Sequence, residues 1–152
     1  MLQLFSHRSI SLFVSFLLLL LSSCMHNDEK DEALQVAHDF AELYFNWRYT
    51  EAMTLADSTC QKELRFLASQ VNENDVRALN QREAPASVEI TSIETKDGNN
   101  YTIEIHAENF LEMDAIGQDA KLVKEAFFNL KVKQVDGKKK WKVFQIPLKN
   151  IY

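Results

Sequence analysis

The chain changes its hydrophobic period once, near residue 85. Before that point, apolar residues recur at the spacing of an amphipathic helix. The longest such stretch runs from Asp31 to Tyr49, with its apolar stripe at Leu34, Ala37, Phe40, Ala41, Tyr44 and Trp47. This spacing predicts a long helix whose apolar side is covered by the rest of the domain.

Shorter helical segments follow the first helix. Ser58, three residues before Gln61, resembles a capping box and predicts the start of a helix there. Asn74 or Asp75 can cap one more short helix. Pro85 ends the helical half, because the residue before a proline disfavours helical geometry.

From Ala86 onward, apolar and polar residues alternate, which predicts strands with one buried face. The positions expected to face the core are Val88, Ile90, Ile103, Ile105, Ala107, Ala126, Phe128, Leu130, Val132, Trp141 and Val143. Residues 96–100 and the pair Asp136-Gly137 are turn signals. A two-residue turn at Asp136-Gly137 would place Val132 opposite Trp141.

Helices followed by strands predict an α+β domain, with N-terminal helices packed on one face of a curved, four-stranded antiparallel sheet that forms a cone-shaped roll. The junction at residues 49–53 and the final-strand stretch at residues 136–143 resemble those of the nuclear-transport-factor-2-like superfamily, the cystatin-like cone shared with ketosteroid isomerase. Within it, the chain most resembles lumazine-binding-like domains of unknown function in small secreted lipoproteins. The resemblance implies a fold and an apolar pocket, and no particular activity.

The N-terminal segment predicts where the protein resides. An apolar run of 12 residues, Ile10 to Leu21, follows Arg8. A membrane span needs about 20 residues, so the run has the layout of a secretion signal. Residues 21–24 (Leu-Ser-Ser-Cys) resemble the bacterial lipobox, which implies cleavage before Cys24 and lipid attachment to it. The alternative is an ordinary signal peptide that leaves Cys24 as a free thiol.

The predicted organisation is a lipoprotein signal peptide at 1–23, a lipidated tether at 24–30 and a single domain at 31–152. The lipid would hold the domain to a membrane outside the cytoplasm. The acidic stretch after Cys24 resembles an export tag and Met25 does not resemble a retention signal, so we expect the outer membrane, with exposure at the surface. A helix N-terminus also favours acidic residues, which explains the same stretch differently.

Charge argues against a nucleic-acid partner. The formal net charge is −5, with −11 over residues 24–112 and +5 over residues 113–152. Nucleic-acid binding requires a basic surface that neutralises phosphates. With Cys24 lipidated, Cys60 has no partner for a disulfide within the chain, and we expect it to be a small packing residue.

We expect no enzyme, because none of the predicted inward positions carries Asp, Glu or His to act as a general base. Tyr101 is the polar-tipped residue of that face. Together with Phe128 and Trp141 it is expected to line a pocket. No nucleotide-binding or cofactor motif is present, so no cofactor is expected.

The histidines predict no metal site. His38 and Glu42, at positions i and i+4 of a helix, supply half of a site without a third ligand. His106 is expected to point outward between two glutamates.

The opposite side of the sheet predicts a contact surface. Phe127 would face Ile146, and Phe144 would lie beside Asn129, forming an exposed apolar cluster that suits a homodimer or another envelope protein. The same pairing predicts a rim in which two lysine pairs lie close together: Lys131 with Lys142, and Lys133 with Lys140. A bulge near Phe144 would instead turn the apolar groups into the core.

These features together predict a non-enzymatic envelope lipoprotein whose cone binds a small apolar ligand or a protein partner. Two alternatives stay open. One is an isomerase-like or dehydratase-like enzyme of the same fold, which needs a buried acid. The other is a structural subunit of a cell-envelope assembly that uses the outward cluster.

Overall fold

The computed structural model describes residues 25–95, 97–113, 118–135 and 140–150. Cys24 with its lipobox and the turn pair Asp136-Gly137 lie outside these residues. The chain divides into two units, residues 1–32 and 33–152, and the fold described below is that of the second unit. None of the described helices is both long enough and apolar enough to cross a membrane.

Helices come first along the chain and strands follow, as the change of period predicts. The helical half contains α2 (Met25–Phe45), α3 (Tyr49–Ala52), a 3₁₀ turn η1 (Met53–Leu55), α4 (Ser58–Gln70) and α5 (Glu73–Gln81). The strands are β1 (Ser87–Thr95), β2 (Asn100–Glu112), β3 (Lys121–Val135) and β4 (Lys140–Lys149).

The helix starts differ from the prediction because other side chains cap them. Asp57, rather than Ser58, caps α4 and accepts two backbone N–H groups of the first turn, at 3.0 and 3.1 Å. Asn72 caps α5, and Asp75 completes a capping box by accepting the Asn72 N–H at 2.9 Å. Each cap satisfies backbone donors that the helix itself leaves without a partner.

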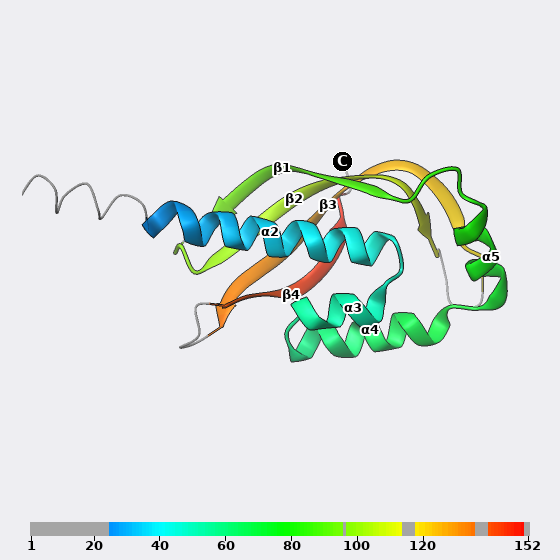
Figure 1. Cartoon of the computed structure of the whole chain (residues 1–152), viewed down its shortest axis with the longest axis horizontal. Coiled ribbons are helices and arrows are strands. Elements are labelled where there is room, and N and C mark those ends of the chain that lie inside the picture. Colours follow the sequence, from blue (N-terminus) through cyan, green and yellow to red (C-terminus); the bar gives the residue numbers. More distant parts are fainter. Residues whose placement is uncertain (1–24, 96, 114–117, 136–139, 151–152) are drawn as a thin grey trace, which may run out of the picture. The chain divides into compact units, whose positions relative to one another are not determined.

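The four strands form one antiparallel sheet in the order β1-β2-β3-β4. Figure 1 shows this sheet as a curved layer, with the part of α2 that belongs to the second unit alongside it. The predicted inward positions are buried or, for Val88, Ile90 and Ala126, partly buried and packed on the core. The alternation pattern and the α+β class are therefore confirmed.

The pairing of β3 with β4 differs from the prediction. Val132 pairs with Val143, whereas a two-residue turn would have paired it with Trp141. The last partners before the connection are Val135 and Lys140, so the connection is longer than two residues. The shift amounts to two positions, and a two-residue slip keeps every side chain on its face. The inward pattern is therefore right although the predicted register is wrong.

The outer edge of β4 is partly covered by the segment before α4. Ala56 forms a parallel bridge with Val143, and the Asp57 N–H donates to the Val143 carbonyl at 2.8 Å. Covering an edge removes free backbone groups that could pair with another chain.

Candidate functional site

A pocket of about 270 Å³ lies among the C-terminal end of α2, the turn after it and the ends of β2 and β4. Six aromatic side chains line it: Tyr44, Phe45, Trp47, Tyr49, Phe110 and Phe128. The other lining residues are Leu67, Leu111, Glu112, Met113, Pro147, Leu148 and Lys149. Ligand sites are typically concave and apolar with a few polar groups, which makes this pocket the candidate site.

Three phenylalanines from different elements form the buried end of the pocket. The ring centroid of Phe45 on α2 lies 4.7 Å from that of Phe128 on β3 and 5.2 Å from that of Phe110 on β2. The rings of Phe110 and Phe128 are 5.4 Å apart and meet edge to face. Such tilted and edge-to-face contacts add stability beyond area burial, so this trio fixes the helix against the sheet.

The turn after α2 brings a further ring into the pocket. Trp47 has a left-handed backbone, with φ of 60°, two residues after the last residue of α2. Its indole N–H donates to the Leu111 carbonyl at 3.2 Å, and its ring stacks on Tyr49 with centroids 6.3 Å apart. A non-glycine residue in this conformation is uncommon and persists only when its contacts hold it there.

Asn46, one residue earlier, ties this turn to the start of β1. Its side-chain amide donates to the Ala86 carbonyl at 3.0 Å, and its amide oxygen accepts the Ala86 N–H at 2.9 Å. The same oxygen accepts a guanidinium N–H of Arg82 at 3.1 Å. The side wall of the pocket is therefore held by hydrogen bonds as well as by packing.

Two tyrosines supply the pocket with hydroxyl groups. Burial, and then the charges of Glu63 and Glu112, raise the pKa of Tyr44 to about 12. Burial, and then Tyr44 and Asp75, also raise the pKa of Tyr49. Both phenols are therefore neutral hydrogen-bond donors near neutral pH. Among the described residues neither hydroxyl forms a hydrogen bond to the protein.

A carboxylate also lines the pocket, which strand alternation alone does not predict. Glu112, at the end of β2, pairs with Lys149 of β4 at 2.8 Å, and the two side chains are 30% and 45% exposed. The alternation of β2 breaks at Asn109, whose φ is 54°, and both Phe110 and its successor are buried after it. Asparagine tolerates this left-handed conformation, so an asparagine before an apolar run was the signal available in the sequence.

The residues predicted to line a pocket are divided between two places. Phe128 lines the pocket described here, and Tyr101 and Trp141 do not. Those two side chains are buried together near the first residues of β2 and β4, whereas the pocket lies near the last residues of these strands. Their ring centroids are 5.1 Å apart. Alternation indicates which face of a strand is buried, but it does not indicate which end of the sheet opens to a ligand.

The predicted outward cluster of Phe127, Phe144 and Ile146 is not one surface. Ile146 packs against the core, and Phe144 is partly buried, with the Lys133 ammonium 5.1 Å from its ring centroid. Phe127 remains 37% exposed. Register irregularities in β3 across residues 129–132 break the regular pairing on which that cluster depended. The predicted neighbours of these three residues are therefore wrong, and a contact role for the residues stays a prediction.

The lysines predicted to form a rim are paired differently from the prediction: Lys131, Lys133, Lys140 and Lys142. Lys133 pairs with Asp57 at 2.8 Å, and the Lys142 ammonium donates to the Thr54 carbonyl. Lys133 lies opposite Lys142, rather than near Lys140 as predicted. Lys140 is exposed and Lys131 is partly buried.

Metal-ligating side chains gather outside the pocket. The His38 ring lies 3.6 Å from the Asp39 carboxylate, on the exposed side of α2. Within the described part of the chain, the group close enough to hold a metal ion is His106, Glu108 and Glu125, on the face of the sheet away from the core.

Comparison with known proteins yields little. No protein-family model and no curated protein matches this chain. One solved structure is similar, described as "Ntf2 like protein involved in plasmid conjugation", with a TM-score of 0.36 and 13% sequence identity. The alignment covers 76% of this chain and 48% of that chain, so this chain spans about half of its length. The α+β class rests on the strand order and on the helices packed against the sheet.

Proposed function

We propose that this protein is a lipid-anchored envelope protein without catalytic activity, and that it binds a small ring-containing apolar ligand. The observation that carries the proposal is the pocket of about 270 Å³ lined by six aromatic side chains. Typical small-molecule sites span about 300–1,000 Å³, so this pocket suits one or two rings rather than a long acyl chain.

The polar groups of the pocket narrow the ligand class further. The neutral phenols of Tyr44 and Tyr49 can each donate a hydrogen bond to an acceptor on the ligand. Glu112 and Lys149 form an ion pair, so their opposite charges neutralise each other. Neither charge is therefore left unpaired to attract a charged ligand. A flat, uncharged ring carrying an oxygen acceptor therefore fits these residues best.

The anchoring part of the proposal comes from the N-terminal sequence. The lipobox-like residues 21–24 follow an apolar run, and the acidic stretch after Cys24 supports an outer-membrane or surface position. Two or more acyl chains give a stable anchor, whereas one chain binds only marginally.

Binding can be tested with 1-naphthol as the probe, by saturation-transfer NMR on the full chain in lipid nanodiscs with empty nanodiscs subtracted. Leu148→Trp enlarges a pocket-lining side chain that is 55% exposed. Leu122→Trp is the matched control, because Leu122 is 60% exposed and does not line the pocket. We expect saturable binding by the wild type, weakened at least about tenfold in Leu148→Trp and unchanged in Leu122→Trp. Equal binding by both variants would place the probe outside the pocket.

One observation favours a second candidate, an acid–base enzyme. Burial, and then the charges of Glu63 and Glu112, raise the pKa of Tyr44, and Tyr44 and Glu112 line the same pocket. A carboxylate base with a phenol donor is suited to proton abstraction next to a carbonyl. Exchange of the α-protons of cyclohexanone for deuterium, followed by NMR, tests this candidate. Catalysed exchange that Glu112→Gln removes without changing the unfolding midpoint would establish it, and no exchange above buffer would exclude that reaction.

A further inference from the structure

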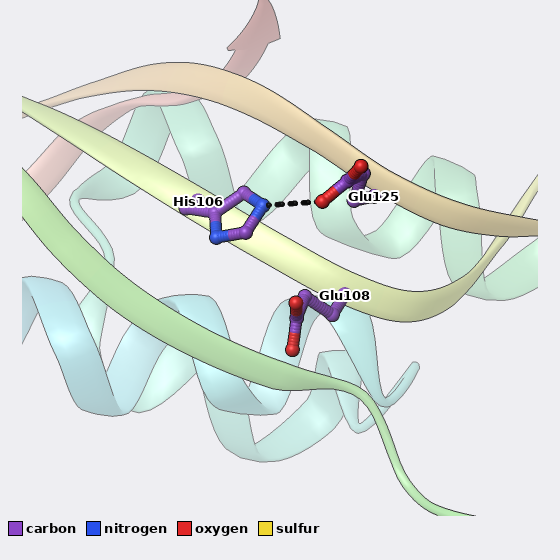
Figure 2. Close-up of side chains that lie close together, drawn as sticks. All are labelled: His106, Glu108 and Glu125. Atoms are coloured by element: carbon purple, nitrogen blue, oxygen red, sulfur yellow. Dashed lines mark hydrogen bonds and ion pairs between the residues drawn. The ribbon is translucent and has the colours of Figure 1, made fainter.

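We propose that His106, Glu108 and Glu125 form a binding site for one divalent transition-metal ion, with zinc as the reference ion. Figure 2 shows the contact between His106 of β2 and Glu125 of β3, with the Glu108 side chain beside them on β2. Their nitrogen and carboxylate oxygen ligand atoms all lie within 4.8 Å of one another. The site lies apart from the aromatic pocket, so it does not depend on the proposed function.

Strand geometry brings the three donors together. His106 and Glu108 are two residues apart on β2, and side chains at that spacing share one face of a strand. Glu125 of β3 is the direct cross-strand partner of Glu108, and Phe127 is the partner of His106. Glu125 therefore lies diagonally across from His106, whose Nε2 is 3.3 Å from the Glu125 Oε2.

The charges at this position favour a bound cation. Like charges directly opposite each other destabilise a sheet, and Glu108 faces Glu125 in that way. Glu89, the partner of His106 on β1, adds a third carboxylate to the neighbourhood. Among the described residues no lysine or arginine forms an ion pair with Glu108 or Glu125. A metal ion would supply the positive charge that this group of carboxylates lacks.

Neighbouring side chains hold the ligands in place. The imidazole of His106 stacks on Phe127, with centroids 4.6 Å apart and ring planes 21° apart. The Ser87 hydroxyl donates to the Glu108 Oε2 at 3.3 Å. Contacts of this outer kind orient metal ligands, and losing them typically costs about 10–100-fold in affinity.

The distances allow a metal to bind with little rearrangement. Zinc binds histidine nitrogen and carboxylate oxygen at about 2.0–2.2 Å, so donors around a tetrahedral ion are about 3.4 Å apart. The pair His106–Glu125 already has that separation, at 3.3 Å. Rotation of the exposed Glu108 side chain closes the remaining gap. Three protein ligands leave one position for water or an added ligand, and the mixed N and O donors suit zinc, cobalt or nickel better than calcium or magnesium.

The test is isothermal titration of the full-length protein with Zn²⁺, after removal of metals, in a neutral detergent. We expect one zinc ion per chain. His106→Gln and Glu125→Gln should each weaken binding at least about tenfold, since each removes a ligand. His38→Gln and Glu104→Gln are the matched controls and should leave the affinity unchanged, because they remove another histidine and another carboxylate of β2 outside the group.

A second readout avoids reliance on substitutions. Co²⁺ bound to the wild type should broaden the NMR signals of the His106 ring and leave those of His38 unchanged, and Zn²⁺ should reverse the broadening. Unfolding midpoints measured in chelator should match between wild type and variants, which confirms that the variants are folded. Zinc affinity in His106→Gln equal to that of the wild type, or broadening centred on His38, would overturn the proposal.

Discussion

Cys60 and Tyr44 have ionisable side chains whose neutral, protonated forms the folded domain favours. Burial, and then the charges of Asp57 and Glu63, raise the pKa of the Cys60 thiol to about 12. Reactive cysteines instead lie where a neighbouring positive charge favours the thiolate. Cys60 is therefore a packing residue of α4, in agreement with its being 1% exposed. Tyr44 is subject to the same two effects, burial and the charge of Glu63.

The raised pKa of Tyr44 predicts a loss of stability in alkali. The folded state keeps this phenol protonated up to about pH 12, whereas the unfolded chain releases the proton near pH 10.0. The contribution of the protonated Tyr44 phenol to the free energy of unfolding is therefore complete below about pH 10, and it disappears as pH rises from about 10 to 12. Two pKa units correspond to about 2–3 kcal/mol at most.

Tyr44→Phe should accordingly reduce the alkaline fall in the free energy of unfolding, measured with urea at a series of pH values. The tyrosinate absorbance of the folded wild type supplies a direct check. Ionisation of Tyr44 near pH 10 in the folded state would contradict the prediction.

At the scale of elements, Asp57 is a junction between a helix and two strands. Its carboxylate caps α4 and pairs with Lys133 of β3, and its backbone N–H bonds to β4. Burial opposes ionisation, but hydrogen bonds from Lys133 and from the backbone of Cys60 and Thr59 outweigh it and lower the pKa of Asp57. One residue therefore joins the start of α4 to the edge of the sheet.

Removing this cap should destabilise the domain more than removing the neighbouring hydroxyl. Asp57→Ala should lower the free energy of unfolding by about 1–2 kcal/mol, the usual cost of losing an N-cap. Ser58→Ala is the control and should change it by less than about 0.5 kcal/mol, since Ser58 is the first helical residue and not the cap. Urea unfolding followed by circular dichroism measures both.

A second substitution at this position, Asp57→Asn, has a pH signature. Because the pKa of Asp57 is lowered in the folded state, its stabilising effect is complete above its unfolded value of 3.8 and is lost as pH falls through the lower folded value. The difference between wild type and Asp57→Asn should shrink in that acidic range. A difference that is constant with pH would show that the charge of Asp57 does not contribute.

At the scale of the whole molecule, the features of the domain lie on separate surfaces. The aromatic pocket lies between helices and sheet, whereas the histidine–glutamate group lies on the other face of the sheet. The proposed lipid attachment belongs to Cys24, outside the described residues. The proposed ligand binding, metal binding and anchoring can therefore be tested one at a time.

Anchoring is tested by Cys24→Ala in cells that produce the full chain. The variant should leave the membrane fraction, because the lipid on Cys24 is the proposed attachment. Zinc titration and unfolding of the released protein should match those of the wild type. A variant that sediments with membranes as the wild type does would contradict the lipid anchor.

The order of elements and the buried faces of the strands could be predicted from the sequence, because both depend on periods that repeat over a few residues. Leu130 and Val143 face the core for that reason, even though the predicted register between β3 and β4 was wrong. A slip of two positions changes the partners of a strand without changing its faces. Local alternation therefore predicts the fold class, but it does not predict which residues of neighbouring strands are partners.

The candidate sites required the tertiary structure, because each combines residues that are distant in sequence. Glu112 enters the pocket only because the backbone at Asn109 breaks the alternation of β2. His106 was predicted to point outward, but its proximity to Glu125 depends on the pairing of β2 with β3. Periodicity assigns a side chain to a face, whereas contacts between elements decide which side chains on that face meet.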